Sequence, residues 1–504
     1  MSSEEGKLED YARRLLRGST LVFLCMVAST FVAFFLRMFL ARSLGVEGYG
    51  LFYSVFFFVS FFLLFRDLGL NSALVKFIPE FRVKGDLSSL RSSLLLVFLF
   101  QSFSSLLLFV PLFLLSGWLS SSFFRTSEAL LPFRLLLFWF LASTFYQLLR
   151  STFQGLQDML AYSLLDLLWI LVILVGSLCL VPSWGISGVA FSYLLSAGLL
   201  TVGGAWYLGR KYGEVAGPLE KKEGTLAKLL SFALPFFLGG LGSLVLAYTD
   251  TLMLTLFRGT REVGLYQAAQ PLAALLGYFV GALTTALFPL VSEMWAKGER
   301  KLVREATGFL FKSSLAVVLP FSLLFLSFPE VAVRLVFGGE YLGSCTALRI
   351  LSCHAVLWAL LSVMGTVVAG VGEPLLITKT VAWMAGLNFL GNLLLIPPFG
   401  ASGAALTTLL SSFLGVLLLP HYAKKKVGKT PFSSLLKVVV GGVLAFLLIS
   451  LLKSLLFLSS WLEVLLIFPP VLSLYLLWLL GTGVFTEGEK KILFRLLPLR
   501  GGRG

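Results

Sequence analysis

Seven polar side chains stand inside long apolar stretches of the sequence, and their types suit ligand binding. A charged group in the middle of a membrane span costs about 2.5–3.5 kcal/mol on insertion scales, so it needs a compensating role. Arginine keeps its positive charge, and its guanidinium group can hold two phosphate oxygens at once. The candidate residues are Arg37, Arg66, Asp67, Asn71, Asp250, Gln267 and Gln270.

Helical spacing groups some of these candidates. Asp67 and Asn71 are four residues apart, and Gln267 and Gln270 are three apart, so each pair lies on one face of a helix. Arg66 lies about 100° around the helix from Asp67, so these two neighbours point in different directions.

A structural interpretation of the charged residues stays open. Arg37 could pair with Asp250, and Arg66 could pair with Asp67 of another turn or with an acid in a loop, purely to hold the helices together. The same choice applies to His354. Histidine titrates near neutral pH and could carry a proton, or this residue could be a satisfied core side chain.

The remaining reactive residue types favour structural roles. The four cysteines lie in apolar runs without the close pairing that metal and redox sites need, and two histidines are too few for a histidine metal site. The end of a phosphate-binding loop is suggested at residues 428–430, but Ala423 stands where that motif needs glycine. We therefore expect no metal, no cofactor and no catalytic residue.

The elements that position the candidates are membrane helices. Hydrophobic residues make up 58% of the chain and charged residues 13%, against roughly 25% charged in soluble proteins. Each span needs about 20 mostly apolar residues. The sequence predicts an all-α polytopic membrane protein with fourteen spans, at 18–43, 50–78, 88–116, 130–153, 159–182, 186–209, 226–257, 262–295, 306–328, 341–369, 374–397, 402–422, 432–458 and 461–482.

The basic residues predict an orientation in the cell membrane. Of the 40 Lys and Arg residues, 30 fall on the side of the N-terminus, 8 on the other side and 2 within spans. Because cytoplasmic loops carry the excess of basic residues, both termini are expected in the cytoplasm. This asymmetry also accounts for the net charge of +15, so no nucleic-acid partner is expected.

The sequence repeats itself with a long period. Residues 181–190 (VPSWGISGVA) match 396–405 (IPPFGASGAA) at an offset of 215, which also aligns 155–158 with 370–373. An offset of 214 aligns 50–53 with 264–267. Spans 1–6 and 7–12 are therefore expected to be two parallel copies of one unit, with a cleft between them.

This repeat predicts the organisation of the chain. The expected parts are an amphipathic cytoplasmic segment at 1–17, an N-lobe at 18–209, a cytoplasmic linker at 210–225, a C-lobe at 226–422, two added spans within 423–482, and an amphipathic cytoplasmic tail at 483–504.

Several motifs resemble polysaccharide flippases of the O-antigen type, in the multidrug/oligosaccharidyl-lipid/polysaccharide exporter superfamily. These motifs are residues 44–52 (LGVEGYGLF), residues 67–70 (DLGL), residues 250–254 (DTLML) and residues 262–269 (EVGLYQAA). The resemblance covers spans 1–12. It implies two six-helix lobes around a central V-shaped cavity, and transfer of a polyprenyl-pyrophosphate-linked oligosaccharide to the outer leaflet by alternating access.

Under that resemblance, Arg37 and Arg66 would bind the pyrophosphate, and the other five candidates would bind sugar hydroxyls or gate the cavity. The expected partners are the lipid-linked oligosaccharide, membrane lipids and a Na⁺ or H⁺ coupling ion, for a chain that acts as a monomer. The alternatives are a cation-coupled drug or metabolite antiporter, a lipid II-type flippase and, with less support from the short acid-poor outer loops, a membrane glycosyltransferase or polymerase.

Overall fold

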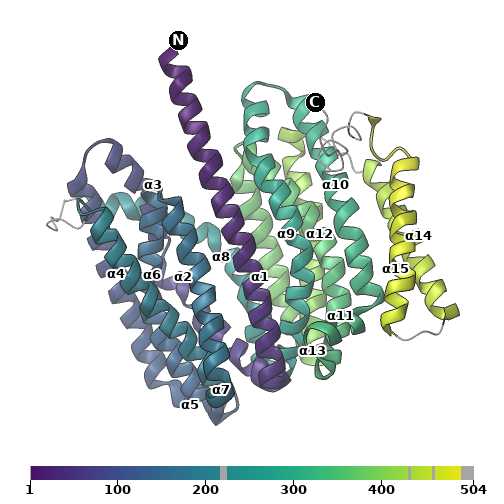
Figure 1. The fold of residues 1–504 in the computed structure, drawn as a ribbon, viewed down its shortest axis with the longest axis horizontal. Coiled ribbons are helices and arrows are strands. Elements are labelled where there is room, and N and C mark those ends of the chain that lie inside the picture. The colour runs from purple at the N-terminus through teal and green to yellow at the C-terminus, as the bar shows by residue number, and fades with distance from the viewer. Residues whose placement is uncertain (1, 216–223, 429–432, 457–459, 488, 490–504) are drawn as a thin grey trace. The chain divides into compact units, whose positions relative to one another are not determined.

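The computed structural model describes residues 2–215, 224–428, 433–456, 460–487 and 489, and every regular element in these ranges is a helix (Figure 1). The predicted all-α class is confirmed. The chain divides into two compact units, each described by itself below. Unit 1 comprises Met1–Leu244 and Leu254–Gly264, and unit 2 comprises Val245–Met253 and Leu265–Gly504. The expected lobe boundaries stay a prediction.

Unit 1 begins with the helices that carry four of the candidate residues. It contains α1 (Ser2–Phe61), α2 (Leu63–Asp67), α3 (Leu70–Val83), α4 (Leu87–Leu114), α5 (Ser116–Ser122), the 3₁₀ turn η1 (Ser127–Ala129), α6 (Leu130–Gly155), α7 (Met159–Lys211) and parts of α8 (Thr225–Arg258) and α9 (Thr260–Ala296).

Unit 2 takes the remaining parts of α8 and α9. Its other elements are α10 (Arg300–Ser327), α11 (Pro329–Val336), the 3₁₀ turn η2 (Gly339–Ser344), α12 (Cys345–Gly370), α13 (Pro374–Val427), α14 (Ser433–Leu456) and α15 (Ser460–Gly481).

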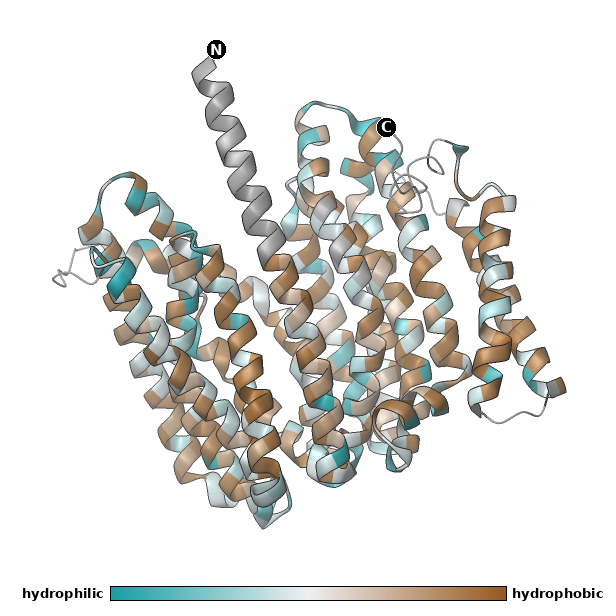
Figure 2. Cartoon of the chain, in the orientation of Figure 1, coloured by the Kyte–Doolittle hydropathy of each residue, from teal (hydrophilic) through white to brown (hydrophobic). Residues whose placement is uncertain are grey.

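The helices are suited to lipid. Ten described helices are long and apolar enough to cross a membrane, or eleven if the bent pair Thr260–Tyr278 and Leu283–Ala296 counts as one span. Hydrophobic colours run along most helices, and hydrophilic colours gather near several helix ends (Figure 2). Large apolar side chains such as Phe31, Trp206 and Leu394 are exposed, which a soluble protein would avoid in such number. The protein is a polytopic membrane protein.

The difference between ten or eleven candidate spans and the fourteen expected has a local cause. Helices α1, α7 and α13 each contain a break, at Gly45, Gly185 and Gly400. Each break falls between two predicted spans. Gly185 has φ 52° and ψ −129°, and Gly400 has φ 54° and ψ −131°. Glycine has no Cβ, so it adopts this left-handed backbone at low cost.

Helices α7 and α13 double back at these breaks. This follows because the two ends of each helix are in contact. In unit 1, Lys211 at the end of α7 contacts Asp158, which caps its start, with Nζ and Oδ2 2.7 Å apart. In unit 2, Lys426 near the end of α13 contacts Glu373 just before its start, with Nζ and Oε1 2.7 Å apart. The repeat at offset 215 pairs these residues, so the two hairpins carry the same ion-pair clamp.

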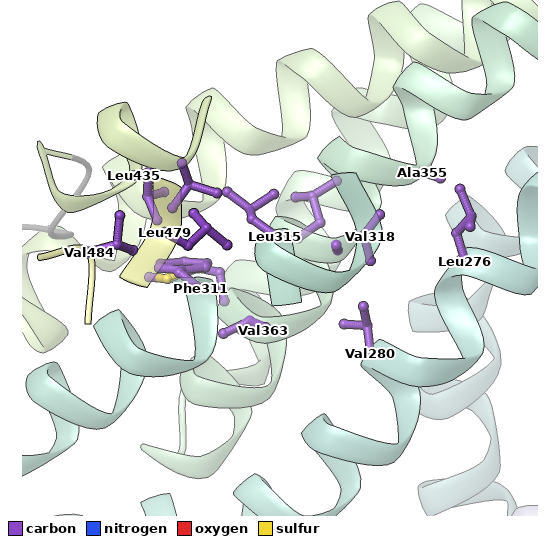
Figure 3. Packing of buried hydrophobic residues seen from close by; sticks show 14 of the residues in the cluster. Leu276, Val280, Phe311, Leu315, Val318, Ala355, Val363, Leu435, Leu479 and Val484 are labelled. Carbon is purple, nitrogen blue, oxygen red and sulfur yellow. The ribbon is translucent and has the colours of Figure 1, made fainter. Parts of the chain in front are cut away.

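Apolar packing dominates the interior of unit 2. One cluster of buried side chains joins α10, α12, α14 and α15, and Figure 3 shows part of it, including Phe311, Leu315, Leu435 and Leu479. In unit 1, a cluster on α3 with Leu74 and Ile78 packs against Leu229 and Ala233 at the start of α8. The cluster of unit 1 includes α3, which carries Asn71, and the cluster of unit 2 includes Leu276 and Val280 of α9, which carries Gln267 and Gln270.

Some sequence predictions fall outside the described residues. The linker predicted at 210–225 includes residues 216–223, and most of the predicted tail 483–504 also lies beyond the described ranges. Helix α1 begins at Ser2, but the side chains of residues 2–17 are not among those described, so their amphipathic character stays a prediction.

Candidate functional site

Arg37 lies in an aromatic setting in unit 1. Its guanidinium carbon is 4.8 Å from the centre of the Tyr53 ring, and its electrostatic neighbours include Tyr49 and Tyr193. The break at Gly45 turns α1 back, which brings Arg37 and Tyr53 together from its two halves. A cation over an aromatic face is stabilised by about 0.5–2 kcal/mol. The half-buried Arg37 is thus held against aromatic rings at this contact.

Aromatic rings continue this setting away from Arg37. The Tyr193 ring of α7 lies 5.1 Å from Phe56 of α1 and 5.8 Å from Trp139 of α6. Ring pairs at these separations add to the burial of apolar area. Three helices of unit 1 are therefore fixed around the tyrosines that surround the arginine.

Arg66 is turned away from Asp67, as its position on the helix predicts. The side chain is 2% exposed, and Nη1 donates to the Phe140 carbonyl oxygen at 2.6 Å and to the Ser143 hydroxyl at 3.0 Å. Both partners belong to α6. These contacts join α2 to α6 through a carbonyl and a hydroxyl oxygen, which is a structural role but not the ion pair with an acid that the sequence left open.

Asp67 lies where α2 breaks before α3. Leu68 has φ 47° and Gly69 has φ 80° at this break. One Asp67 carboxylate oxygen accepts the backbone N–H of Asn71 at 3.0 Å and the side-chain amide of Gln101 at 2.7 Å. Asp67 therefore caps the first turn of α3, a structural role that its sequence position also allows.

Two amide oxygens close to this cap lack a donor. Among the described residues, the buried Oδ1 of Asn71 and Oε1 of Gln101 have no hydrogen-bond partner. An unpaired buried acceptor costs about 1–3 kcal/mol, so a ligand hydroxyl that reached either oxygen would recover that loss.

Asp250 is the centre of a polar network in unit 2. The residue is 5% exposed. Its Oδ1 accepts the side-chain amides of Asn392 at 2.7 Å and Asn388 at 3.2 Å, and its Oδ2 accepts the hydroxyls of Tyr266 at 2.6 Å and Thr408 at 2.7 Å. The four donors are neutral and come from α9 and α13. They solvate the carboxylate without adding positive charge.

The two glutamine candidates are not in the same environment. Gln267 is buried, and its amide donates to the Thr251 hydroxyl at 2.8 Å, which ties α9 to α8 within unit 2. Gln270 is exposed. The two glutamines lie about one helical turn apart, but Gln267 is buried in the protein and Gln270 is exposed, so they do not form one site here.

Sequence reasoning missed most partners of the candidates. Gln101 and the pair Asn388 and Asn392 stand in apolar runs, and the cost of a polar amide in lipid could have marked them. Tyr193 and Thr408 carried no such signal. Within the described ranges, no three His, Cys, Asp or Glu side chains gather in a way that would hold a metal ion.

Comparison with known proteins identifies the family. Residues 15–295, more than half of the chain, match the model of the family described as polysaccharide biosynthesis protein. The chain belongs to this family. Residues 235–394 also match the MatE model. Both belong to the multidrug/oligosaccharidyl-lipid/polysaccharide exporter superfamily, so the resemblance seen in the motifs is confirmed. The protein is a transporter of this superfamily and not an enzyme.

Three known proteins are similar to this chain. An uncharacterized membrane protein of Methanocaldococcus jannaschii is 27% identical over 424 residues, covering 80% of this chain and 83% of that protein. A Haloferax volcanii protein, named a probable low-salt glycan biosynthesis flippase, is 27% identical over 248 residues, covering 49% of this chain and 52% of that protein. The structure of the lipid II flippase MurJ, inward closed, has a TM-score of 0.75 at 16% identity, covering 94% of this chain and 100% of that one. This last likeness shows the fold.

Proposed function

We propose that this protein is a flippase that moves a polyprenyl-pyrophosphate-linked oligosaccharide from the cytoplasmic to the outer leaflet. The observation that carries the proposal is Arg37, a half-buried arginine in a membrane helix with tyrosines around it. Membership of the polysaccharide biosynthesis family and similarity to a relative named as a glycan flippase support the substrate class.

The chemistry of the substrate fits the polar groups of unit 1. The pyrophosphate carries the negative charge that a guanidinium in lipid needs, and hydrogen bonds to charged groups contribute about 1.5–3 kcal/mol. The unpaired oxygens of Asn71 and Gln101 would accept sugar hydroxyls, which are donors. Among the candidates, Arg37 is therefore proposed as the phosphate ligand, and Asp67 and Asn71 as parts of a sugar contact.

The proposed topology has fourteen crossings with both termini in the cytoplasm. The doubling back of α7 and α13, and the break in α1, support two crossings for each of these three helices. The proposed lobes are residues 18–209 and 226–422, followed by two added helices, and transport is proposed to proceed by alternating access.

The proposal is tested with the purified protein in proteoliposomes and a fluorescent polyprenyl-pyrophosphate-linked oligosaccharide. Wild type should expose the labelled sugar on the far leaflet, and Arg37→Gln should slow this at least tenfold. Arg42→Gln is the matched control, because Arg42 is an exposed arginine on the same helix. Equal rates for wild type and protein-free vesicles would refute the proposal. Equal rates for wild type and Arg37→Gln would show that Arg37 is not the phosphate ligand.

A cation-coupled antiporter is the second candidate, and Asp250 favours it. The match to the MatE model covers this residue, and its carboxylate is held by neutral donors. In the same vesicles, efflux of a lipophilic cationic dye driven by a Na⁺ or H⁺ gradient would support the antiporter. Dye efflux without glycan movement would show that the protein is an antiporter and not a glycan flippase.

A further inference from the structure

The inference begins with a glycine turn that occurs once in each copy of the repeat. The offset of 214 pairs Gly45 with Gly259 and Gly50 with Gly264. Gly45 has φ 66° and ψ 177°, and Gly259 has φ 85° and ψ −178°. Residues with a Cβ rarely adopt this backbone, so both turns need glycine at this position. The two copies therefore contain the same turn, and both turns belong to unit 1.

The two turns pack against each other with almost no space between their backbones. A Cβ atom added at Gly50 would overlap the carbonyl oxygen of Thr260 and lie 2.7 Å from the backbone nitrogen of Gly264. A Cβ atom added at Gly264 would overlap the carbonyl oxygen of Val46. The offset of 214 also pairs Val46 with Thr260, so the contact is reciprocal. It resembles the contact across a two-fold axis in a symmetric dimer.

The reciprocal contact holds the tip of the α8–α9 hairpin on α1. This tip is Leu254–Gly264, and the residues on either side of it in the sequence belong to unit 2. The Thr255 hydroxyl of the tip donates to the Ser54 hydroxyl of α1 at 3.0 Å, and both side chains are buried. Arg125 Nη2 donates to the Leu256 carbonyl oxygen, in the last turn of α8, at 2.9 Å. The tip is therefore docked by hydrogen bonds as well as by the two glycines.

An ion pair also joins the two turns, but it is too exposed to hold them. Glu47 and Arg261, again paired by the offset of 214, have Oε1 and Nη1 3.6 Å apart. Their side chains are 72% and 65% exposed, respectively. Water screens such charges, so pairs of this kind contribute little. The close backbone contact at Gly50 and Gly264 therefore sets how near the two turns approach.

We propose that the two glycine turns are a latch, which holds the α8–α9 tip on α1 in this conformation and releases it during transport. A transporter that exposes its substrate to each side in turn needs contacts that form in one conformation and break in another. A reciprocal contact between two short turns suits this use, because it forms or breaks as one unit. Glycine at both positions lets it close without the rearrangement of any bulky side chain.

Only the use of the latch in transport rests on the proposed function. Opening of the latch is measured without any glycan, by the access of a thiol reagent to a buried position beside it. A failure of glycan transport and a failure of latch opening are therefore separate results.

The test uses Ser54→Cys as a reporter, because Ser54 is fully buried and bonded to Thr255 of the tip. The four native cysteines are first replaced by alanine. The full-length protein is placed in lipid nanodiscs, where a water-soluble maleimide reaches both faces. The reporter should react slowly when both glycines are present, and at least tenfold faster in Gly50→Ala and in Gly264→Ala. Unchanged labelling in both alanine variants would overturn the proposal.

Two controls separate release of the latch from general destabilisation. Gly117→Ala is the matched substitution, because Gly117 is an exposed glycine of α5 whose added Cβ meets nothing within 4 Å, so it should leave the labelling rate unchanged. A second reporter, Ser105→Cys, replaces a buried serine of α4 whose hydroxyl is 3.0 Å from that of Thr144 on α6. It should stay protected in Gly50→Ala. Equal acceleration at both reporters would mean that alanine unfolds unit 1, and would overturn the proposal.

A cross-link tests whether transport needs the latch to open. Glu47→Cys and Arg261→Cys, joined in the background without native cysteines by a short bis-methanethiosulfonate, hold the two turns together. Glycan movement in proteoliposomes should fall at least tenfold and should return when a reductant cleaves the cross-link. Full transport by the cross-linked protein would show that the latch stays closed during the cycle, and would overturn the proposal.

Discussion

Arg37 in unit 1 and Asp250 in unit 2 stand in matching parts of the repeat but carry opposite charges. The offset of 214 pairs Tyr53 with Gln267, and the offset of 215 pairs Tyr193 with Thr408. Tyr53 and Tyr193 surround Arg37, whereas Thr408 donates to Asp250 and Gln267 donates to the adjacent Thr251. One helical scaffold therefore supports an arginine among tyrosines in one unit and a carboxylate among amides and hydroxyls in the other.

The two settings suit different tasks. An aromatic ring stabilises a cation through its face without cancelling the charge, so Arg37 remains able to attract an anion. Four neutral donors from α9 and α13 satisfy the carboxylate of Asp250 on α8, so its contacts join these three helices within unit 2. The proposed function therefore places anion binding at Arg37 in unit 1, whereas the contacts of Asp250 hold the helices of unit 2 together.

The largest effect on stability is expected at Asp250. Asp250→Asn replaces one acceptor by a donor that faces donors already in place, and each buried donor left unpaired costs about 1–3 kcal/mol. Thermal unfolding in detergent should shift downward by several degrees, and Thr408→Val, which removes one donor, should shift it less. Equal stability of Asp250→Asn and wild type would mean that the network does not hold unit 2 together.

A smaller loss is expected at Arg66, where sequence and structure favour different roles. Arg66→Met removes two hydrogen bonds to α6, so we expect a loss of about 1–3 kcal/mol and near wild-type transport for each folded molecule. Transport is measured in proteoliposomes and divided by the amount of monodisperse protein. If transport falls as far as in Arg37→Gln while stability is unchanged, Arg66 binds the pyrophosphate as its sequence position suggests.

The smallest effects are expected at the two hairpin clamps. The Asp158 side chain is 5% exposed and that of Glu373 is 31% exposed, so Lys211→Met should destabilise the protein more than Lys426→Met. Partly exposed ion pairs contribute about 0.2–1 kcal/mol. Because the clamps lie in different units, the double variant should lose the sum of the two single losses.

The clamp of unit 1 also predicts an acid dependence. Burial raises the pKa of Asp158, but the hydrogen bonds from Lys211 and from the Ala161 N–H outweigh it, so the pKa lies below its usual value. The stabilisation is present above the usual carboxyl pKa of about 4 and is lost as the pH falls through the lowered value. Lys211→Met should therefore make the free energy of unfolding depend less on pH between about pH 2 and 5, as measured by denaturant unfolding at each pH. An unchanged pH dependence would contradict this.

The sequence predicted features that depend on local pattern. The repeat at 181–190 and 396–405 marked both helix breaks, because glycine at a fixed register gives the same backbone in each copy. The positions of Arg66 and Asp67 on their helix also predicted that the two side chains diverge. These features need only spacing and residue type.

The partners of each candidate depend on packing between distant segments. Asp250 contacts residues more than 130 positions later, and Arg66 contacts α6 more than 70 positions later. Helical periodicity fixes the direction of a side chain on its own helix, but not which helix faces it. The apolar composition of the spans was easy to recognise from the sequence. Where one helix ends and the next begins was harder, because α1, α7 and α13 each continue through a glycine break as one helix.

The most direct test of the account compares two substrates in the same vesicles. Wild-type protein should translocate a polyprenyl-pyrophosphate-linked oligosaccharide at least tenfold faster than the same glycan on an uncharged polyprenyl carrier. Arg37→Gln should lose this preference, because the charge-assisted contact worth about 1.5–3 kcal/mol is gone. A preference that survives in Arg37→Gln, or the absence of any preference in wild type, would contradict the assignment of anion binding to unit 1.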